Sequence, residues 1–85
     1  MKEFTYTVTN PIGIHARPAG LLAKEAKKFV SVCTITKGEQ TQKLTQLMML
    51  MAMGIKLGDT VTVRAEGEDE DTAIQALETY FKANL

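Results

Sequence analysis

Polar and apolar residues alternate along two stretches of the chain, and this alternation predicts β-strands. The first stretch is FTYTVT at residues 4–9, and the second is TVTVRAEG at residues 60–67. β-Branched and aromatic residues at a period of two are typical of strands with one buried face. Residues 31–36 (SVCTIT) and 41–45 (TQKLT) are predicted strands as well, and the turn at Gly38 between them indicates a hairpin.

Three other stretches have apolar residues at helical spacing. The first runs from residue 16 to residue 30. Its predicted buried face consists of Ala19, Leu22, Ala23, Ala26, Phe29 and Val30. The second, residues 44–54, is short, and Gly54 is expected to end it in a left-handed conformation. The third covers residues 69–85 and has acidic residues in its first turn, where they suit the positive end of a helix dipole. Its predicted buried face consists of Ile74, Leu77, Tyr80 and Phe81.

The predicted elements follow one another in the order βαββαβα. This order fits an α+β domain, a four-stranded antiparallel sheet with its helices packed on one face. A chain of 85 residues has room for one hydrophobic core, and no linker or repeat divides it. We therefore expect a single domain over residues 1–85.

Composition excludes several classes of protein. Ten basic and ten acidic residues balance, and the chain has no tryptophan, so an electrostatically driven or base-stacking nucleic-acid binder is not expected. No apolar run reaches the length of a membrane span, and the alternating residues 1–10 are no secretory signal, so we expect a cytoplasmic protein that binds neither nucleic acid nor membrane. The single cysteine, Cys33, can form neither an internal disulfide nor a zinc site with the single histidine, and we expect it to be a buried structural thiol.

The only histidine, His15, lies in GIHARPAG at residues 13–20, where the first helix is expected to begin. Free amides and the helix dipole favour bound negative charge at that place, and they disfavour a cationic imidazole, which should stay neutral and nucleophilic. Arg17 follows two residues later and can pair with an anion on the ring. Gly13 permits an unusual backbone and close approach by another molecule.

These features describe a nucleophile that carries a phosphoryl group. Transfer of phosphoryl groups depends mainly on positioning and on neutralising charge, which helix-end amides and an arginine supply. The sequence has no Walker-type phosphate loop, no metal-binding motif, no cofactor motif and no Ser/His/Asp set for acyl transfer. A single nucleophile without an obvious substrate pocket favours a carrier that receives the group from one protein and passes it to another.

The segment from Gly13 to Pro18 resembles the active-site signature of HPr, the histidine-containing phosphocarrier family of the phosphoenolpyruvate-dependent sugar phosphotransferase system. Residues 43–55 (KLTQLMMLMAMGI) resemble the family's second signature, and residues 61–77 also resemble the family. The resemblance implies an open-faced β-sandwich of four strands and three helices. It also implies a covalently modified carrier with no enzymatic activity of its own.

The resemblance assigns roles to the residues around His15. The ring would accept the phosphoryl group on Nδ1 from phosphorylated enzyme I and donate it to an enzyme IIA domain of a sugar transporter. Arg17 would hold the phosphate yet remain free to swing away, and the Ala16 and Arg17 amides would bind it at the helix end. No cofactor or metal is implied.

Two surface groups are predicted to bind partners. The first shares one face of the first helix and consists of Ala16, Gly20, Lys24 and Lys27. Its lysines suit an acidic partner, although a solvated helix face would show the same pattern. The second consists of Leu47, Met48 and Met51, which are expected to be exposed and match the family's hydrophobic contact patch, whereas Leu50 and Met53 are expected in the core. Methionines that only fill gaps in a core are the alternative.

The sequence departs from the family at two positions. Many HPr proteins have a regulatory serine before the short helix, and Gln46 occupies that position here, which puts kinase control in doubt. Thr45 has a hydroxyl but lies one residue before the position of that serine, so we do not expect it to be phosphorylated in its place. Ile12 replaces a small polar residue that is frequent in the family, and a change in phosphohistidine lifetime is expected.

The leading interpretation is therefore a monomeric phosphocarrier for sugar transport. A second interpretation is a regulatory member of the same fold that binds a transcription regulator. A third is a small phosphatase-like enzyme that uses Arg17 for phosphate, although no residue is obviously placed to activate water.

Overall fold

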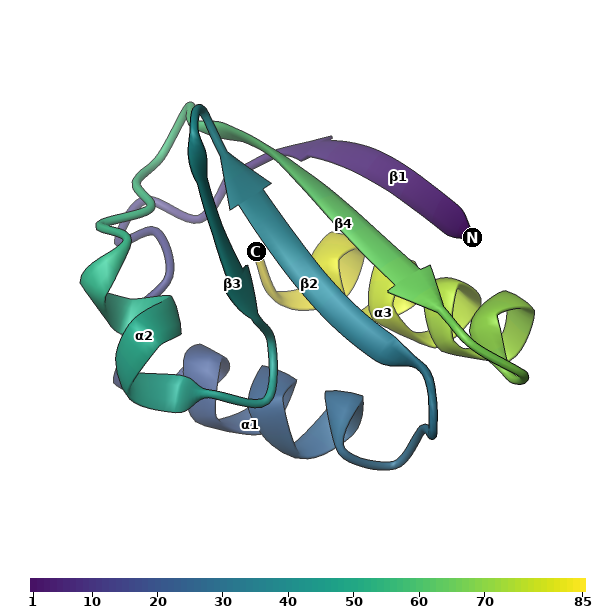
Figure 1. Cartoon of the computed structure of the whole chain (residues 1–85). Coiled ribbons are helices and arrows are strands. Elements are labelled where there is room, and N and C mark those ends of the chain that lie inside the picture. The colour runs from purple at the N-terminus through teal and green to yellow at the C-terminus, as the bar shows by residue number, and fades with distance from the viewer.

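The computed structural model describes all 85 residues, and its elements follow the predicted order (Figure 1). The strands are β1 (Lys2–Thr7), β2 (Val32–Lys37), β3 (Gln40–Lys43) and β4 (Thr60–Glu66). The helices are α1 (Ala16–Ala26), α2 (Leu47–Ala52) and α3 (Glu70–Asn84). None of the three helices combines the length and the hydropathy that a membrane-spanning helix requires.

The four strands form one antiparallel sheet in the order β1-β4-β2-β3. Thr5 of β1 lies opposite Thr62 of β4, and Thr62 lies opposite Thr36 of β2. Successive residues of a strand point to opposite faces, so Val61 and Val63, which are fully buried, point to the other side from Thr62. One face of the sheet is therefore polar and open, and the other is apolar.

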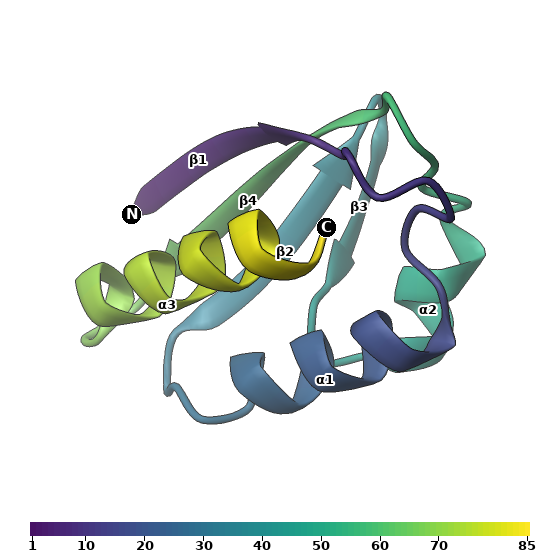
Figure 2. The ribbon, with the colours of Figure 1, turned by 180° about the vertical axis from the view of Figure 1, so that it is seen from behind.

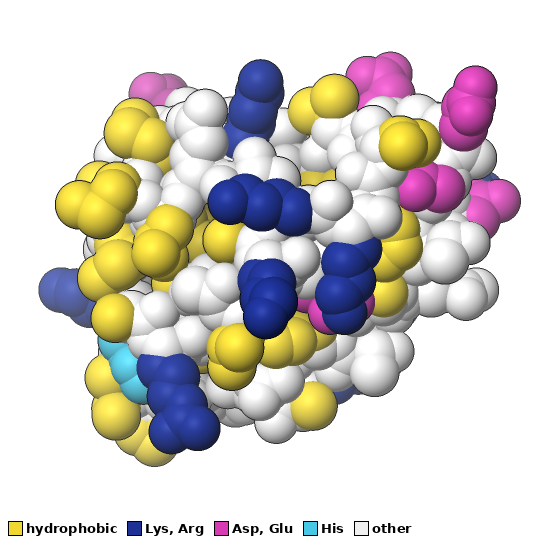
Figure 3. Space-filling model, turned by 90° about the horizontal axis from the view of Figure 1, so that it is seen from below, with side chains coloured by type: hydrophobic (Ala, Val, Ile, Leu, Met, Phe, Trp, Pro, Cys, Tyr) yellow, Lys and Arg dark blue, Asp and Glu magenta, His cyan; other side chains and the backbone are white.

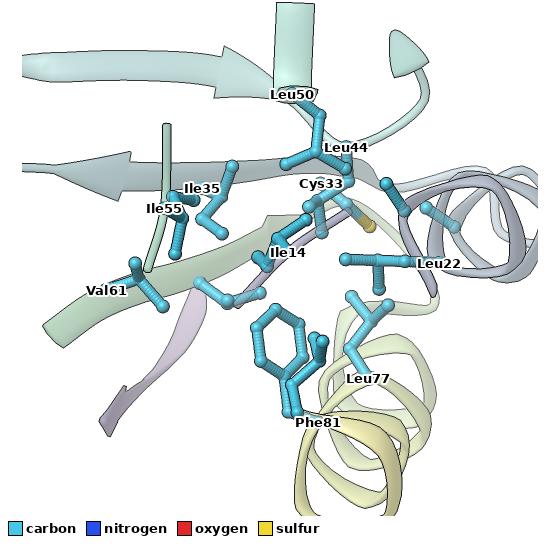
Figure 4. Packing of buried hydrophobic residues seen from close by; sticks show 14 of the residues in the cluster. Ile14, Leu22, Cys33, Ile35, Leu44, Leu50, Ile55, Val61, Leu77 and Phe81 are labelled. Carbon is cyan, nitrogen blue, oxygen red and sulfur yellow. The ribbon is translucent and has the colours of Figure 1, made fainter. Parts of the chain in front are cut away.

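The helices lie on the apolar face (Figures 1 and 2). Helix α3 packs against β1 and β4, α1 packs against α3, and α2 lies beside α1 at the end of β3. Figure 4 shows the core between these layers, where Leu22 of α1 and Leu77 of α3 meet the sheet. Phe81 packs edge to face against Phe4, with ring centroids 5.5 Å apart. The architecture is the expected open-faced β-sandwich.

The first helix is shorter than its hydrophobic pattern predicts. Helix α1 ends at Ala26, and Phe29, which follows it, is half-buried. Val30 has 76% of its surface exposed, so the prediction that Val30 belongs to the buried face was wrong. The amide of Phe29 bonds three residues back, to the Ala26 carbonyl at 3.3 Å, which tightens the final turn. The amide of Val30 donates to the Asp69 carboxylate at 2.9 Å, and the chain turns there into β2.

Asp69 connects the start of β2 with the start of α3. Its carboxylate accepts hydrogen bonds from the Val30 amide, the Ser31 amide at 2.9 Å and the Ser31 hydroxyl. The Ser31 hydroxyl in particular, with the two amides, holds the pKa of the Asp69 carboxyl below its usual range. The stability that these bonds provide is present above the ordinary carboxyl pKa and is lost as the pH falls through the lowered one.

Smaller differences concern strand ends and the cysteine. Strand β1 covers residues 2–7 and not 4–9, because the Val8 amide leaves the ladder and donates to the Asp59 carbonyl at 2.9 Å. Strand β2 begins and ends one residue later than predicted, and β3 ends two residues earlier, at Lys43. Cys33 is buried as expected, and burial raises the pKa of its thiol.

Candidate functional site

His15 caps the amino-terminal end of α1. Its backbone is extended, with φ −124° and ψ −179°, and its carbonyl accepts the first helical hydrogen bond from the Ala19 amide at 2.9 Å. The imidazole makes no capping bond and is partly exposed. The amides of Ala16 and Arg17 donate to no group of the protein, and Pro18 has no amide hydrogen. The prediction that the helix begins directly after His15 is confirmed, and two free donors lie beside the ring.

The residues before His15 are fixed by the loop that follows α2. The Ile14 amide donates to the Ile55 carbonyl at 3.1 Å, and the Ile14 side chain is buried in the core (Figure 4). Gly13 has a φ of +76°, and a Cβ atom there would lie 2.8 Å from the Lys56 Cα and closer still to the Ile55 carbonyl oxygen. The close approach at Gly13 is therefore made by the chain's own backbone, and the expectation that another molecule approaches there was wrong.

Replacing Gly13 should disturb this support. We expect Gly13→Ala to lower the free energy of unfolding by about 1–3 kcal/mol, because alanine is strained at positive φ and its Cβ meets backbone atoms that cannot swing aside. Gly20→Ala is the matched control, since Gly20 is helical, a methyl group there would meet no atom within 4 Å, and the variant should gain about 0.5–1 kcal/mol. Urea denaturation measures both, and equal stabilities for the two variants would contradict the prediction.

A hollow of about 260 Å³ opens beside the His15 ring. It is lined by Asn10, His15, Arg17, Pro18, Leu21, Tyr80 and Asn84. The sequence did not predict this hollow, and Asn10, Tyr80 and Asn84 were missed as site residues. The last two lie one turn apart on α3 and reach the site only because α3 packs on α1. No local pattern in the sequence contains that information.

Three cations on α1 or directly after it have no acidic partner. Arg17 takes part in none of the ion pairs of the structure, nor do Lys24 and Lys27 on the same helix. The first turn of α1 contains no acidic residue. Two free amides and an unpaired guanidinium therefore lie at the same end of α1 as the His15 ring, and such groups favour an anion. No cluster of three or more His, Cys, Asp or Glu residues could hold a metal ion.

The two predicted partner surfaces are adjacent. Ala16, Lys24 and Lys27 are exposed and Gly20 is half-buried, and all lie on or directly after α1. Figure 3 shows this face from below, with several basic side chains in the middle, the largest group of apolar side chains on the left and most of the acidic ones at the upper right.

The α2 residues divide largely as expected. Leu50 and Met53 are buried, Met51 is exposed, and Met48 has 77% of its surface exposed. Leu47 was expected to be exposed, but it is half-buried and packs against the core, because α2 presents its first residue toward the interior of the fold. The exposed apolar surface is therefore carried mainly by the methionines.

The two positions that depart from the family signature are both at the surface. Gln46 caps α2 at its amino end, and its side chain makes no capping bond. Ile12 is exposed, and its amide donates to the Asn10 side-chain oxygen at 2.9 Å. Thr45, the hydroxyl nearest to Gln46, is half-buried.

Comparison with known proteins gives consistent matches along the whole chain. A family model described as the PTS HPr component phosphorylation site matches residues 2–83. The phosphocarrier protein HPr of Mycoplasma capricolum is 48% identical over 77 residues, which cover 91% of this chain and 86% of that protein.

Solved structures agree with the sequence matches. The structure of HPr from Thermoanaerobacter tengcongensis superimposes with a TM-score of 0.93 at 37% identity, over 98% of this chain and 93% of the other. The catabolite repression protein Crh of Bacillus subtilis, whose crystal structure is a domain-swapped dimer, has a TM-score of 0.78 at 32% identity, over 100% of this chain and 98% of the other.

Proposed function

The chain belongs to the HPr family of phosphotransferase-system phosphocarriers, and on that premise we propose that His15 is the residue that carries the phosphoryl group. It accepts the group on Nδ1 from phosphorylated enzyme I, which phosphoenolpyruvate charges, and passes it to enzyme IIA domains of sugar transporters in the cytoplasm. The observation that carries the proposal is the partly exposed ring at the start of α1, beside two free amides.

Each transfer exchanges one bond to phosphorus for another. The lone pair of the neutral ring nitrogen attacks phosphorus, and the bond between phosphorus and the donor breaks, so that its electron pair leaves with the donor. The second transfer repeats the step with His15 as the leaving group. The transferred group has its charge spread over three oxygens, and the Ala16 and Arg17 amides with the Arg17 guanidinium offset this charge.

The lining of the hollow favours a carrier over a phosphatase. It contains no carboxylate that could act as a general base toward water, and His15, its only ring base, is the proposed nucleophile. A phosphoryl group on His15 is therefore expected to wait for a protein acceptor. We propose that the chain is a covalently modified intermediate in a transfer chain and has no independent enzymatic activity.

We propose that both partners dock on the same surface of α1 and α2. The unpaired cations at Arg17, Lys24 and Lys27 favour an acidic partner and speed its encounter. The apolar part consists of Met48 and Met51 with the half-buried Leu47, and Ala16 and Gly20 leave room near the ring. Flexible methionines can repack against two unrelated partners, which a serial carrier requires.

A charge in the methionine patch should weaken docking. We expect Met48→Glu to raise the dissociation constants for enzyme I and enzyme IIA by about 10-fold or more, because binding would bury an unpaired carboxylate. Val30→Glu is the matched control, since Val30 is exposed to 76% against 77% for Met48 and lies outside the patch. Titration calorimetry with each partner measures the effect, and unchanged affinity of Met48→Glu for both would remove Met48 from the interface.

The oligomeric state is proposed to be monomeric. Strand β1 pairs along its whole length with β4 of the same chain, from Lys2 opposite Ala65 to Thr7 opposite Thr60. The amino group of Met1 adds an ion pair to Glu70 on α3 at 2.5 Å. Sedimentation at micromolar concentration would distinguish this monomer from a swapped dimer of the kind formed by Crh.

Phosphoenolpyruvate-dependent labelling tests the proposed function. The protein is incubated with enzyme I and phosphoenolpyruvate, and the expected product contains one phosphoryl group that is labile in acid and stable in base. Addition of an enzyme IIA domain should discharge the label onto that domain. Steady release of inorganic phosphate from small phosphate esters, without enzyme I, would instead support the phosphatase interpretation.

A further inference from the structure

The carboxyl-terminal end of α3 contacts the chain on both sides of His15. The Tyr80 hydroxyl donates a hydrogen bond of 2.7 Å to the Pro18 carbonyl, in the first turn of α1. On the other side of His15, the backbone amide of Asn10 donates to the backbone oxygen of Leu85 at 2.8 Å. The end of α3 therefore holds both of the segments between which the ring lies.

Side chains extend this connection. The Asn84 side-chain amide donates to the Tyr80 carbonyl at 3.0 Å, and the Asn10 side-chain amide donates to the Asn84 carbonyl at 3.1 Å. The Asn10 side-chain oxygen in turn accepts from the Ile12 amide at 2.9 Å. A continuous set of contacts thus runs from the first turn of α1 through the last turn of α3 to the loop that precedes the ring.

Tyr80 also forms part of the wall of the hollow that contains His15 and Arg17. Burial, and secondarily the Glu25 carboxylate, raises the pKa of the Tyr80 phenol, so the hydroxyl keeps its hydrogen near neutral pH. That single hydrogen is used by the Pro18 carbonyl. The phenol is therefore a permanent donor that joins α3 to the first turn of α1.

The geometry points to Tyr80 as a positioning residue for phosphoryl transfer. By holding the Pro18 carbonyl it fixes the orientation of the first turn of α1. That turn contains the free amides of Ala16 and Arg17, which the proposed function assigns to binding the group on His15. The inference rests on the proposed function and adds to it a residue that takes no part in forming or breaking a bond to phosphorus.

The expected consequence concerns the rate of transfer and not the affinity for partners. Hydrogen-bond donors stabilise a developing anion best when they are held in place before it forms. If the first turn of α1 must reorient during the reaction, part of the stabilisation of the transition state is lost. Tyr80 acts through Pro18 and not through a contact of its own with the phosphoryl group. Loss of its hydroxyl should therefore lower kcat and leave KM unchanged.

Tyr80→Phe tests this inference because it removes one oxygen and keeps the ring. We expect kcat for phosphorylation by enzyme I to fall about 3- to 10-fold, the range that corresponds to loss of one neutral hydrogen bond, with the KM for this protein unchanged. Nuclear magnetic resonance supplies a second readout. Phosphorylation should shift the amide signals of Ala16 and Arg17 less in the variant than in the original protein.

Two controls separate positioning from stability. Tyr6→Phe removes the same oxygen from the only other tyrosine, whose hydroxyl makes no hydrogen bond within the protein, and it should change neither readout. Ser31→Ala removes the hydroxyl bond to Asp69 at the opposite end of α3. It should shift the urea midpoint by an amount comparable to Tyr80→Phe and leave kcat unchanged.

The outcomes are distinct. Normal kcat and normal amide shifts in Tyr80→Phe would overturn the inference, and so would an equal loss of kcat in Ser31→Ala, because the effect would then follow stability alone. Failure of the unaltered protein to take up a phosphoryl group from enzyme I would instead overturn the proposed function. If the unaltered protein is labelled and the Tyr80→Phe variant has unchanged kcat and amide shifts, only the role of Tyr80 is overturned.

Discussion

His15→Ala should accept no phosphoryl group from phosphorylated enzyme I, whereas the unaltered protein accepts one. The chain contains no second histidine that could replace the ring. The hollow beside it offers no carboxylate, thiol or amine as a substitute nucleophile. The remaining amides and Arg17 can bind an anion but cannot form a bond to phosphorus. We therefore expect loss of all labelling, measured by intact-protein mass spectrometry under conditions that preserve an acid-labile group.

The variant should remain folded, which makes the result interpretable. The His15 side chain makes no hydrogen bond in the structure and is partly exposed, so alanine removes no internal bond. Urea denaturation should show a change of less than about 1 kcal/mol. Label on a folded His15→Ala protein would locate the carrier residue elsewhere and refute the central assignment. If the variant is folded and unlabelled, unfolding cannot account for the absence of label.

Local patterns were sufficient for most of the fold. The alternation at residues 60–67 identified β4, because a strand with one buried face must alternate, and the buried Val61 and Val63 confirm it. Leu50 and Met53 were separated correctly from the exposed Met48, since a short helix can bury only one side. The start of α1 directly after His15 followed from Pro18, because proline is tolerated in the first turn of a helix and not in its interior.

The errors arose where a contact distant in the sequence decided the local conformation. Val30 continues the helical pattern of α1, but its amide is bonded to Asp69, 39 residues away, and the chain turns into β2 instead. Gly13 was interpreted as permitting close approach by another molecule, yet backbone atoms of Ile55 and Lys56 lie against it. Neither contact has a signal in its own segment.

The same limitation explains why the candidate site was only half anticipated. His15 and Arg17 lie two residues apart, so their proximity follows from the sequence alone. Tyr80 and Asn84 are more than 60 residues away and join them through the packing of α3 on α1. Sequence reasoning thus identified the proposed reacting group and the cation two residues after it, and the structure added the α3 residues that line the hollow with them.

Arg17→Ala should slow phosphoryl transfer to His15 by about 10- to 100-fold while labelling still reaches one group per chain. The guanidinium is the only cation that lines the hollow, and it has no ion-pair partner to compete with an incoming phosphoryl group. Loss of one donor that is held in place beforehand costs about 10²–10³ in rate, and the exposed Arg17 guanidinium has no ion-pair partner that holds it. The estimate here is lower because the Arg17 amide remains in the variant. Rapid-quench kinetics with phosphorylated enzyme I measures the rate.

Two further variants test whether the slower transfer is due to loss of the guanidinium itself or to loss of a positive charge. Arg17→Lys keeps one positive charge but cannot bind two oxygens at once, and it should recover only part of the rate. Arg64→Ala removes the other arginine, which pairs with Glu3 at 2.9 Å on the sheet. It alters the net charge by the same amount and should transfer at the original rate. Long-range attraction between this protein and phosphorylated enzyme I depends on net charge and not on a position beside His15. Equal slowing in Arg64→Ala would therefore mean that Arg17 acts on the encounter of the two proteins and not on the transfer step.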